Sequence, residues 1–268
     1  MTLVVTILGC GSSGGVPRVG GGWGACDPGN PKNRRRRCSI LVEQHGAAGT
    51  TRVLVDTSPD LREQLLGAGV QHLDGVLYTH QHADHTHGID DLRPLSLHMR
   101  RSIHVYANRV TDDFLRETFG YCFATPLGSD YPPFLVDHSV ENGEPLVVKG
   151  AGGPLEAVPF RMQHGSIEAL GFRFGRFAYA TDVSAMPEES VAALLGLDLL
   201  VVDALRYRPH PTHFSVAEAL DFIARVAPRR AVLTNLHNDL DYARLAAELP
   251  PHVEPAYDGL RLAVDENA

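Results

Sequence analysis

The segment Thr79-His80-Gln81-His82-Ala83-Asp84-His85-Thr86-His87-Gly88 places four histidines and one aspartate within eight positions. The strand-forming run Val76-Leu77-Tyr78-Thr79 leads into it, so the polar residues are expected to form a loop at a strand end. Imidazole and carboxylate groups at this density are typical ligands of zinc, iron or manganese. A solvated loop or a purification tag is the alternative, but a tag would not lie mid-chain behind a buried strand. The segment therefore predicts a metal site.

The spacing HxHxDH in this segment resembles the signature of the metallo-β-lactamase superfamily. The resemblance implies an α/β fold, a four-layer αββα sandwich in which two mixed β-sheets face each other and helices flank them. It also implies that metal ions bind at one edge of the sheets. The residues that carry the signature are His80, His82, Asp84 and His85.

Length and composition agree with a single domain over residues 1–268, because no linker divides the chain and its length allows a large core. The hydrophobic content of 44% and charged content of 21% are those of an ordinary globular protein. A net charge of −8 argues against a stable nucleic-acid partner.

The first residues, 1–8, carry neither the basic region nor the cleavage site of a signal peptide, and they are too short to span a membrane. We therefore expect a cytoplasmic protein with no membrane partner. In that compartment free thiols are favoured over disulfides, and we expect them at Cys10, Cys26, Cys38 and Cys122.

A glycine-rich loop, residues 9–15, follows the first expected strand, residues 3–8. It matches neither the Walker pattern nor the dinucleotide fingerprint, so a tight turn and a substrate-facing loop both stay open. The resemblance implies that this loop looks onto the metal site, which makes Ser12 and Ser13 candidate substrate-binding residues. The basic run 32–37 is expected to be solvated surface rather than an anion site.

Three helix starts are expected from capping residues. Ser58 is predicted to cap a helix with Pro59 at its first position, and Thr111 to open a helix over residues 111–119. Ser215 and Glu218 form a predicted capping box ahead of an apolar stripe. Just before the first of these helices, Asp56 ends a strand, and the resemblance implies that it supports the histidine loop from behind.

The second half of the chain supplies single polar residues at the ends of expected strands. A strand over residues 155–162 leads to His164, and a strand over 177–180 leads to Asp182. By resemblance, His164 is a further ligand and Asp182 a carboxylate that bridges two metal ions. The two structural halves are expected to meet near residues 143–153. Three other histidines, His98, His104 and His138, are expected to be structural or surface residues rather than ligands.

The resemblance thus implies two divalent ions, zinc or manganese. His80, His82 and His164 are expected to hold one ion. Asp84, His85 and His237 are expected to hold the other, with Asp182 between them and Asp84 also in a catalytic role. Two ions about 3.5–4 Å apart can lower the pKa of a bridging water toward ~7, so that the resulting hydroxide attacks a bound ester.

Within the superfamily the chain looks most like the phosphoribosyl cyclic phosphodiesterase (PhnP-like) branch. The stretches that carry this resemblance are residues 8–17, Cys38-Ser39, Thr181-Asp182, Asp203 with His213, Leu233-Thr234 and Tyr257-Asp258-Gly259. It implies that His213 binds phosphate or protonates the leaving group, with Asp203 behind it. A helix-capping or surface role for His213 is the alternative.

The chain departs from that branch at two places. Relatives carry their last ligand directly after the residue that matches Thr234, where this chain has Asn235, so either Asn235 or His237 completes the second site. The phosphonate-breakdown enzyme that typifies the branch also has a cysteine-rich structural zinc site in the early loop. Only Cys26 remains near that place, so we expect the structural zinc site to be absent.

The first functional hypothesis is a binuclear phosphodiesterase that acts on a small or cyclic phosphate ester or nucleotide. A tRNA 3′-processing nuclease is an alternative, but the sequence shows neither a long clamping insertion nor a basic surface. A glyoxalase-like thioesterase or lactonase is another alternative, and a non-catalytic ligand-binding metalloprotein is a third. Relatives often dimerise, so a homodimer is an expectation as well.

Overall fold

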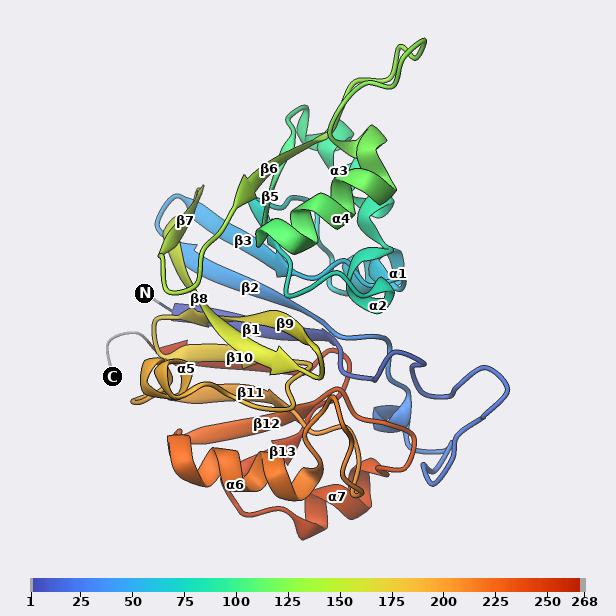
Figure 1. Cartoon of the computed structure of the whole chain (residues 1–268), viewed down its shortest axis with the longest axis vertical. Coiled ribbons are helices and arrows are strands. Elements are labelled where there is room, and N and C mark those ends of the chain that lie inside the picture. The colour runs from blue at the N-terminus through green and yellow to red at the C-terminus, as the bar shows by residue number, and fades with distance from the viewer. Residues whose placement is uncertain (1, 266–268) are drawn as a thin grey trace.

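The computed structural model describes residues 2–265 as two seven-stranded β-sheets that lie face to face (Figure 1). The first sheet has the order β14 (Arg261–Asp265), β1 (Thr2–Gly9), β2 (Ser39–Gly46), β3 (Gly49–Val55), β4 (Gly75–Leu77), β5 (Ile103–Ala107) and β6 (Leu135–Ser139). The second has the order β13 (Val253–Pro255), β12 (Arg230–Thr234), β11 (Leu199–Asp203), β10 (Phe177–Ala180), β9 (Ile167–Phe174), β8 (Gly153–His164) and β7 (Leu146–Gly150).

Both sheets are mixed in the same way. The strands from β14 to β3 pair antiparallel, and those from β3 to β6 pair parallel. In the second sheet β7 to β10 pair antiparallel and β10 to β13 parallel. The chain crosses from one sheet to the other between β6 and β7, close to the predicted junction.

Helices cover the outer face of each sheet and complete the four layers (Figure 1). Apolar residues of α1 (Leu61–Gly67), α3 (Leu92–Met99) and α4 (Arg109–Phe119) pack on the first sheet. Those of α5 (Glu188–Ala193), α6 (Val216–Val226) and α7 (Tyr242–Glu248) pack on the second. Four short elements lie in the connections: η1 (Pro31–Asn33), α2 (Ala83–Thr86), η2 (Ile89–Asp91) and η3 (Gly120–Cys122). The predicted αββα architecture is confirmed.

The alternation of side chains along β11 shows how the layers are held together. Leu199 and Val201 pack into the core between the two sheets, whereas Leu200 and Val202 pack against the helices. Successive side chains of a strand point to opposite faces, so a strand covered on both faces is apolar throughout. This strand is therefore central, and its polar last residue, Asp203, reaches the edge of the sheet.

Two predicted helix starts are wrong, and one is confirmed. The first helix begins at Leu61 rather than at Pro59, and the Ser58 hydroxyl accepts a hydrogen bond from the Asp60 backbone N–H. The helix predicted from Thr111 begins at Arg109, because the Asn108 side chain caps it by accepting from the Thr111 backbone N–H at 2.9 Å. The capping box ahead of α6 is present as predicted.

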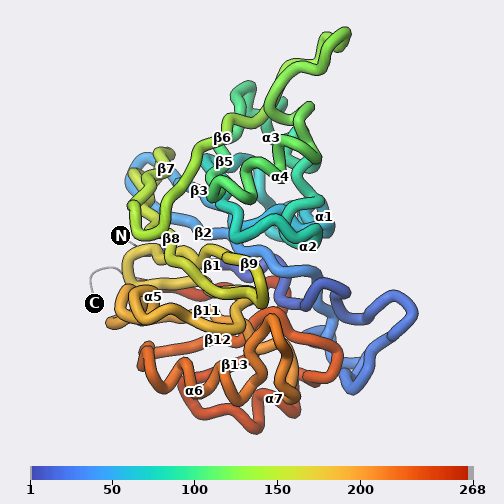
Figure 2. Tube along the Cα trace, in the orientation of Figure 1, coloured from blue at the N-terminus to red at the C-terminus, as the bar shows by residue number. Residues whose placement is uncertain are grey.

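The basic run is only partly solvated: Arg34 is exposed, but Arg35 is buried, contrary to the prediction. Arg35 is only 2% exposed and donates hydrogen bonds to the backbone carbonyls of Leu240 and His237. Its neighbours Arg36 and Arg37 pair with Asp258 and Asp60 at 3.0 and 3.1 Å. Through these contacts the run holds the early loop, residues 10–38, against the start of α1 and the C-terminal part of the chain. Figure 2 shows this blue loop extending beside the orange and red C-terminal part.

A second loop, residues 124–133, projects from the body between η3 and β6 (Figures 1 and 2).

The four cysteines are buried and free, as expected. Within residues 2–265, every helix is too short or too polar to cross a membrane.

Candidate metal centre

The histidine loop lies where the sequence predicts it, directly after β4. His80 follows the strand, and His82 immediately precedes the short helix α2, which carries Asp84 and His85 in its only turn. His80 and His85 are fully buried, whereas His82 is exposed. The Nε2 atom of His80 lies 3.0 Å from Nδ1 of His82, so the two ring nitrogens face each other.

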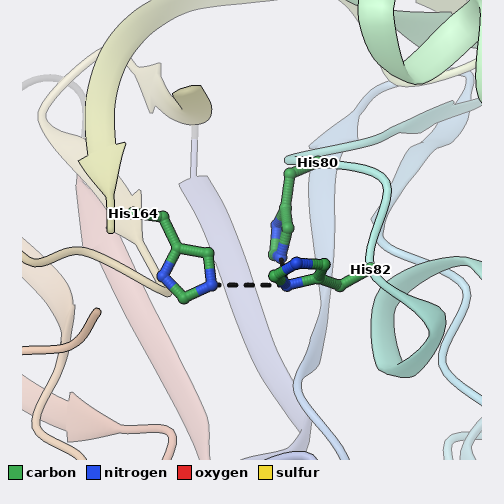
Figure 3. Close-up of side chains that lie close together, drawn as sticks. All are labelled: His80, His82 and His164. Atoms are coloured by element: carbon green, nitrogen blue, oxygen red, sulfur yellow. Dashed lines mark hydrogen bonds between the residues drawn. The ribbon is translucent and has the colours of Figure 1, made fainter. Parts of the chain in front are cut away.

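Side chains from the second sheet reach the same point. His164 ends β8, and Asp182 follows β10. The His164 Nε2 atom lies 3.3 Å from His82 Nδ1, and Figure 3 shows the rings of His164, His80 and His82 turned toward one another. A backbone hydrogen bond of 2.8 Å from Leu170 to Thr79 joins the second sheet to the histidine loop. The carboxyl ends of neighbouring strands that run the same way meet at one sheet edge, which explains the convergence.

Three groups of candidate ligand atoms each lie within 4.8 Å of one another. They share members, so together they form one continuous cluster. The groups are His80, His82 and His164; His80, His85 and Asp182; and His164, Asp182 and His213. Asp84 adjoins them, with its Oδ2 atom 3.4 Å from His85 Nε2. Among residues 2–265, no such group contains His237.

The cluster fits divalent cations by its own chemistry. Within the described part of the chain, the buried Nε2 atom of His85 makes no hydrogen bond, although Asp182 Oδ2 lies 3.2 Å away. A buried polar atom without a partner is costly, and a ligated ion would give this nitrogen one. Carboxylates of Asp56, Asp84 and Asp182 surround the same ring, so the site concentrates negative charge that a cation would balance.

The pKa values of the histidines agree with this view. Burial lowers the pKa of His80 and of His164, which keeps both rings neutral and their ring nitrogens able to bind a metal. Burial alone would lower the pKa of His85 too, but the carboxylates of Asp182, Asp84 and Asp56 hold it well above the usual value. The carboxylates that raise the pKa of His85 are the same groups that would attract a cation.

Two buried carboxylates orient histidines of the cluster. Asp56 accepts hydrogen bonds from the Thr79 backbone and hydroxyl, both at 2.8 Å, and from His85 Nδ1 at 2.7 Å. Asp203, at the end of β11, lies 2.8 Å from His213 Nδ1, and burial raises the pKa of Asp203 to about 6. Its hydrogen bond raises the pKa of His213 against the opposing effect of burial. Carboxylates behind metal-bound histidines commonly fix the orientation of the ring.

A backbone feature of the centre has no counterpart in the sequence analysis. Asp56, Asp182 and Asn235 each follow a strand of the sheets and each have a positive φ, of 65°, 56° and 60°. Residues other than glycine seldom adopt this left-handed conformation, although Asp and Asn tolerate it best. The sharp turns at β3, β10 and β12 aim these side chains back across the sheet edge.

The structure separates the two candidates for the last ligand. The Asn235 Nδ2 atom lies 3.1 Å from His213 Nδ1 and 3.4 Å from both carboxylate oxygens of Asp182. His237 lies farther out, with Nε2 2.5 Å from Arg18 Nη1 and Nδ1 3.2 Å from Asp239 Oδ2. Asn235 thus occupies the centre, and His237 contacts an arginine on the wall of the cavity.

A cavity of about 430 Å³ opens over the cluster. Ser12 and Ser13 of the glycine-rich loop line it, together with Asp84, His164 and His213. Seven further lining residues were not predicted from the sequence: Arg18, Ser166, Ile167, Leu205, Arg206, His210 and Thr212. For most of them the one available signal is closeness along the chain to His164 or His213.

A two-sheet sandwich with a histidine and carboxylate cluster at the edge of its sheets is the architecture of metal-dependent hydrolases. The family model of the beta-lactamase superfamily domain matches residues 51–235, and the chain belongs to this superfamily.

Its relatives place the chain more narrowly, near the PhnP branch. The crystal structure of a diphosphatase from the PhnP family superposes with a TM-score of 0.88 and 36% sequence identity, covering 98% of each chain. The octanoyltransferase of Porphyromonas gingivalis is 36% identical over 265 residues, which are 97% of this chain. The chain spans only about half (51%) of that protein's length. The coenzyme PQQ synthesis protein B of Methylobacterium nodulans is 30% identical over 74% of this chain and 71% of its own.

Proposed function

We propose that this protein is a binuclear metal-dependent phosphodiesterase that hydrolyses a small or cyclic phosphate ester or nucleotide. The observation that carries the proposal is the cluster of histidines and carboxylates at the floor of a polar cavity. The relationship to a PhnP-family protein described as a diphosphatase supports a phosphate ester as the substrate.

The residues fall into two ligand sets. His80, His82 and His164 would hold one divalent ion, and Asp84 and His85 would hold a second, with Asp182 shared. Zinc and manganese both suit this mixture of imidazole and carboxylate. When bound, two such ions activate water at neutral pH and polarise a phosphoryl oxygen.

His213 is the chain's own candidate for contact with the reacting phosphate. The hydrogen bond between its Nδ1 atom and Asp203 orients the ring and leaves Nε2 as the nitrogen for substrate. From there the ring can bind a phosphoryl oxygen or give a proton to the leaving group. The Ser12 and Ser13 hydroxyls line the same cavity and can donate to the ester.

The cavity favours a polar substrate over an acyl one. Of the described residues that line it, only Ile167 and Leu205 are apolar, so few apolar side chains could pack against the chain of a fatty acyl group. The transferase activity in the name of the Porphyromonas protein belongs to a chain twice as long. A tRNA nuclease is not favoured either, since the projecting loop 124–133 carries no lysine or arginine to contact phosphates.

The test is hydrolysis of a panel of cyclic and linear phosphodiesters, with a thioester and a lactone as comparison substrates. Chelation should abolish turnover, and added manganese or zinc should restore it while the protein stays folded throughout. Faster hydrolysis of the thioester or the lactone would reject the phosphodiesterase. Metal-loaded protein without any turnover would favour a ligand-binding role.

A further inference from the structure

Two arginines on the wall of the cavity have no carboxylate partner within the described residues, 2–265. Arg18 contacts His237, and Arg206 donates only to the backbone carbonyls of Arg208 and Pro209, at 3.2 and 3.1 Å. Among residues 2–265, neither side chain forms an ion pair with a carboxylate. The chain carries 32 acidic against 24 basic residues, so unpaired arginines here do not reflect a shortage of acids.

Ser12 adds an independent observation in the same cavity. Ser12 is 4% exposed, and its Oγ atom has no hydrogen-bond partner among residues 2–265. A buried hydroxyl without a partner carries a desolvation cost that a bound acceptor would remove. The hydroxyl and the two guanidinium groups line one cavity, and all of them are hydrogen-bond donors suited to an anion.

The position of Arg18 depends on its neighbours. A β-carbon at Gly14 would lie 2.5 Å from Arg18 Nε, so the absence of a side chain at Gly14 lets the guanidinium lie over the loop. On the other side His237 contacts Arg18 at 2.5 Å, and Asp239 in turn lies 3.2 Å from His237. His237 is therefore a positioning residue for Arg18.

We propose that Arg18, Arg206 and Ser12 form a second anion subsite, which binds a phosphate group next to the phosphate that is hydrolysed. The substrate class is then a diester of diphosphate, as in esters of nucleoside diphosphates. Water would add to the phosphorus at the metal centre, the P–O–P bond would break, and the phosphate in the subsite would leave with the proton. Planar guanidinium groups bind phosphate through paired hydrogen bonds, which suits this task better than isolated lysines. The inference rests on the proposed function for the reaction itself, but binding at the subsite does not depend on turnover.

The first test is calorimetric titration of chelator-treated protein with inorganic pyrophosphate. Arg18→Gln and Arg206→Gln should each weaken binding about tenfold or more, because each removes charged hydrogen bonds to the anion. Arg208→Gln is the matched control, since it removes the same charge from an exposed position two residues away. Binding that is unchanged in R18Q and R206Q, or weakened equally in R208Q, would overturn the subsite.

His237→Ala separates the two roles that this histidine can have. As a positioning residue it should leave the metal content unchanged and weaken pyrophosphate binding several-fold. Loss of one metal equivalent with unchanged pyrophosphate binding would make it a ligand instead and would remove it from the subsite.

A second test uses the metal-loaded enzyme and two substrates, ADP-ribose with its diphosphate linkage and bis-p-nitrophenyl phosphate with one phosphate. R18Q and R206Q should lower the ratio of kcat/KM for ADP-ribose to kcat/KM for the single phosphate at least tenfold, and R208Q should not. An unchanged ratio contradicts the subsite even if both esters are hydrolysed. If wild-type enzyme hydrolyses neither, the proposed function fails, and pyrophosphate binding still decides the subsite.

Discussion

The two halves of the molecule build their sides of the metal centre differently. The first half provides four candidate ligands within residues 80–85, on one loop and one helical turn. The second half provides His164, Asp182 and His213, each from a different strand end or connection. The first set is brought together by local chain geometry, whereas the second exists as a set only after β8, β10 and β11 have paired through their sheet.

The largest effect should come from removing one ligand on either side. His82→Ala in the first half and His164→Ala in the second should each lower turnover about 10³-fold, because metal ions contribute several kcal/mol to catalysis. Both variants should lose metal, as measured by elemental analysis together with kcat for a phosphodiester. Exposed His98 in α3 provides the control, and H98A should behave as wild type. Normal metal content in H164A would mean that the second half supplies no ligand at that position.

A substitution of His213 tests whether the two second-half histidines of the cluster, His164 and His213, have the same role. His213→Ala should lower kcat about 10²-fold, the usual contribution of a general acid, and should retain both metals. Its Nδ1 atom is already bonded to Asp203, which is consistent with substrate contact through Nε2. Metal content is measured together with kcat. Loss of one equivalent of metal in this variant would show that His213 is a metal ligand.

Asp56 supports the histidine loop in the first half of the chain. Its substitution should have the next smaller effect, on metal affinity. Asp56→Asn replaces one of the oxygens that accept from Thr79 and His85, so the loop loses part of its support. Metal affinity should fall 10–100-fold, as competition with a coloured chelator would show. Asp113→Asn, at an exposed position of α4, is the control with the same change of charge. An unchanged affinity in D56N would show that the histidine loop holds its geometry without this carboxylate.

The same contrast explains what could be predicted from the sequence. The histidine loop and the resemblance that it carries were enough for the αββα fold, and strand ends indicated His164 and Asp182. The positions of Asn235 and His237 relative to the centre could not be predicted, because they depend on a left-handed turn after β12 that no local pattern encodes. Arg35 was wrongly expected at the surface. Its burial could not be predicted, because the carbonyl groups that accept its hydrogen bonds lie more than 200 positions away in the sequence.

Substitutions at helix caps should have the smallest effect. They allow a comparison between α6 in the second half, whose cap was predicted correctly, and α4 in the first half, whose cap was not. Ser215→Ala at α6 and Asn108→Ala at α4 should each lower the free energy of unfolding by about 1 kcal/mol. Thr111→Val should be neutral or slightly stabilising, because the buried Thr111 hydroxyl has no hydrogen-bond partner and its removal costs nothing. Urea unfolding measures all three variants. If T111V were the more damaging change at α4, the threonine side chain would support the start of this helix after all, and the assignment of Asn108 as its cap would have to be given up.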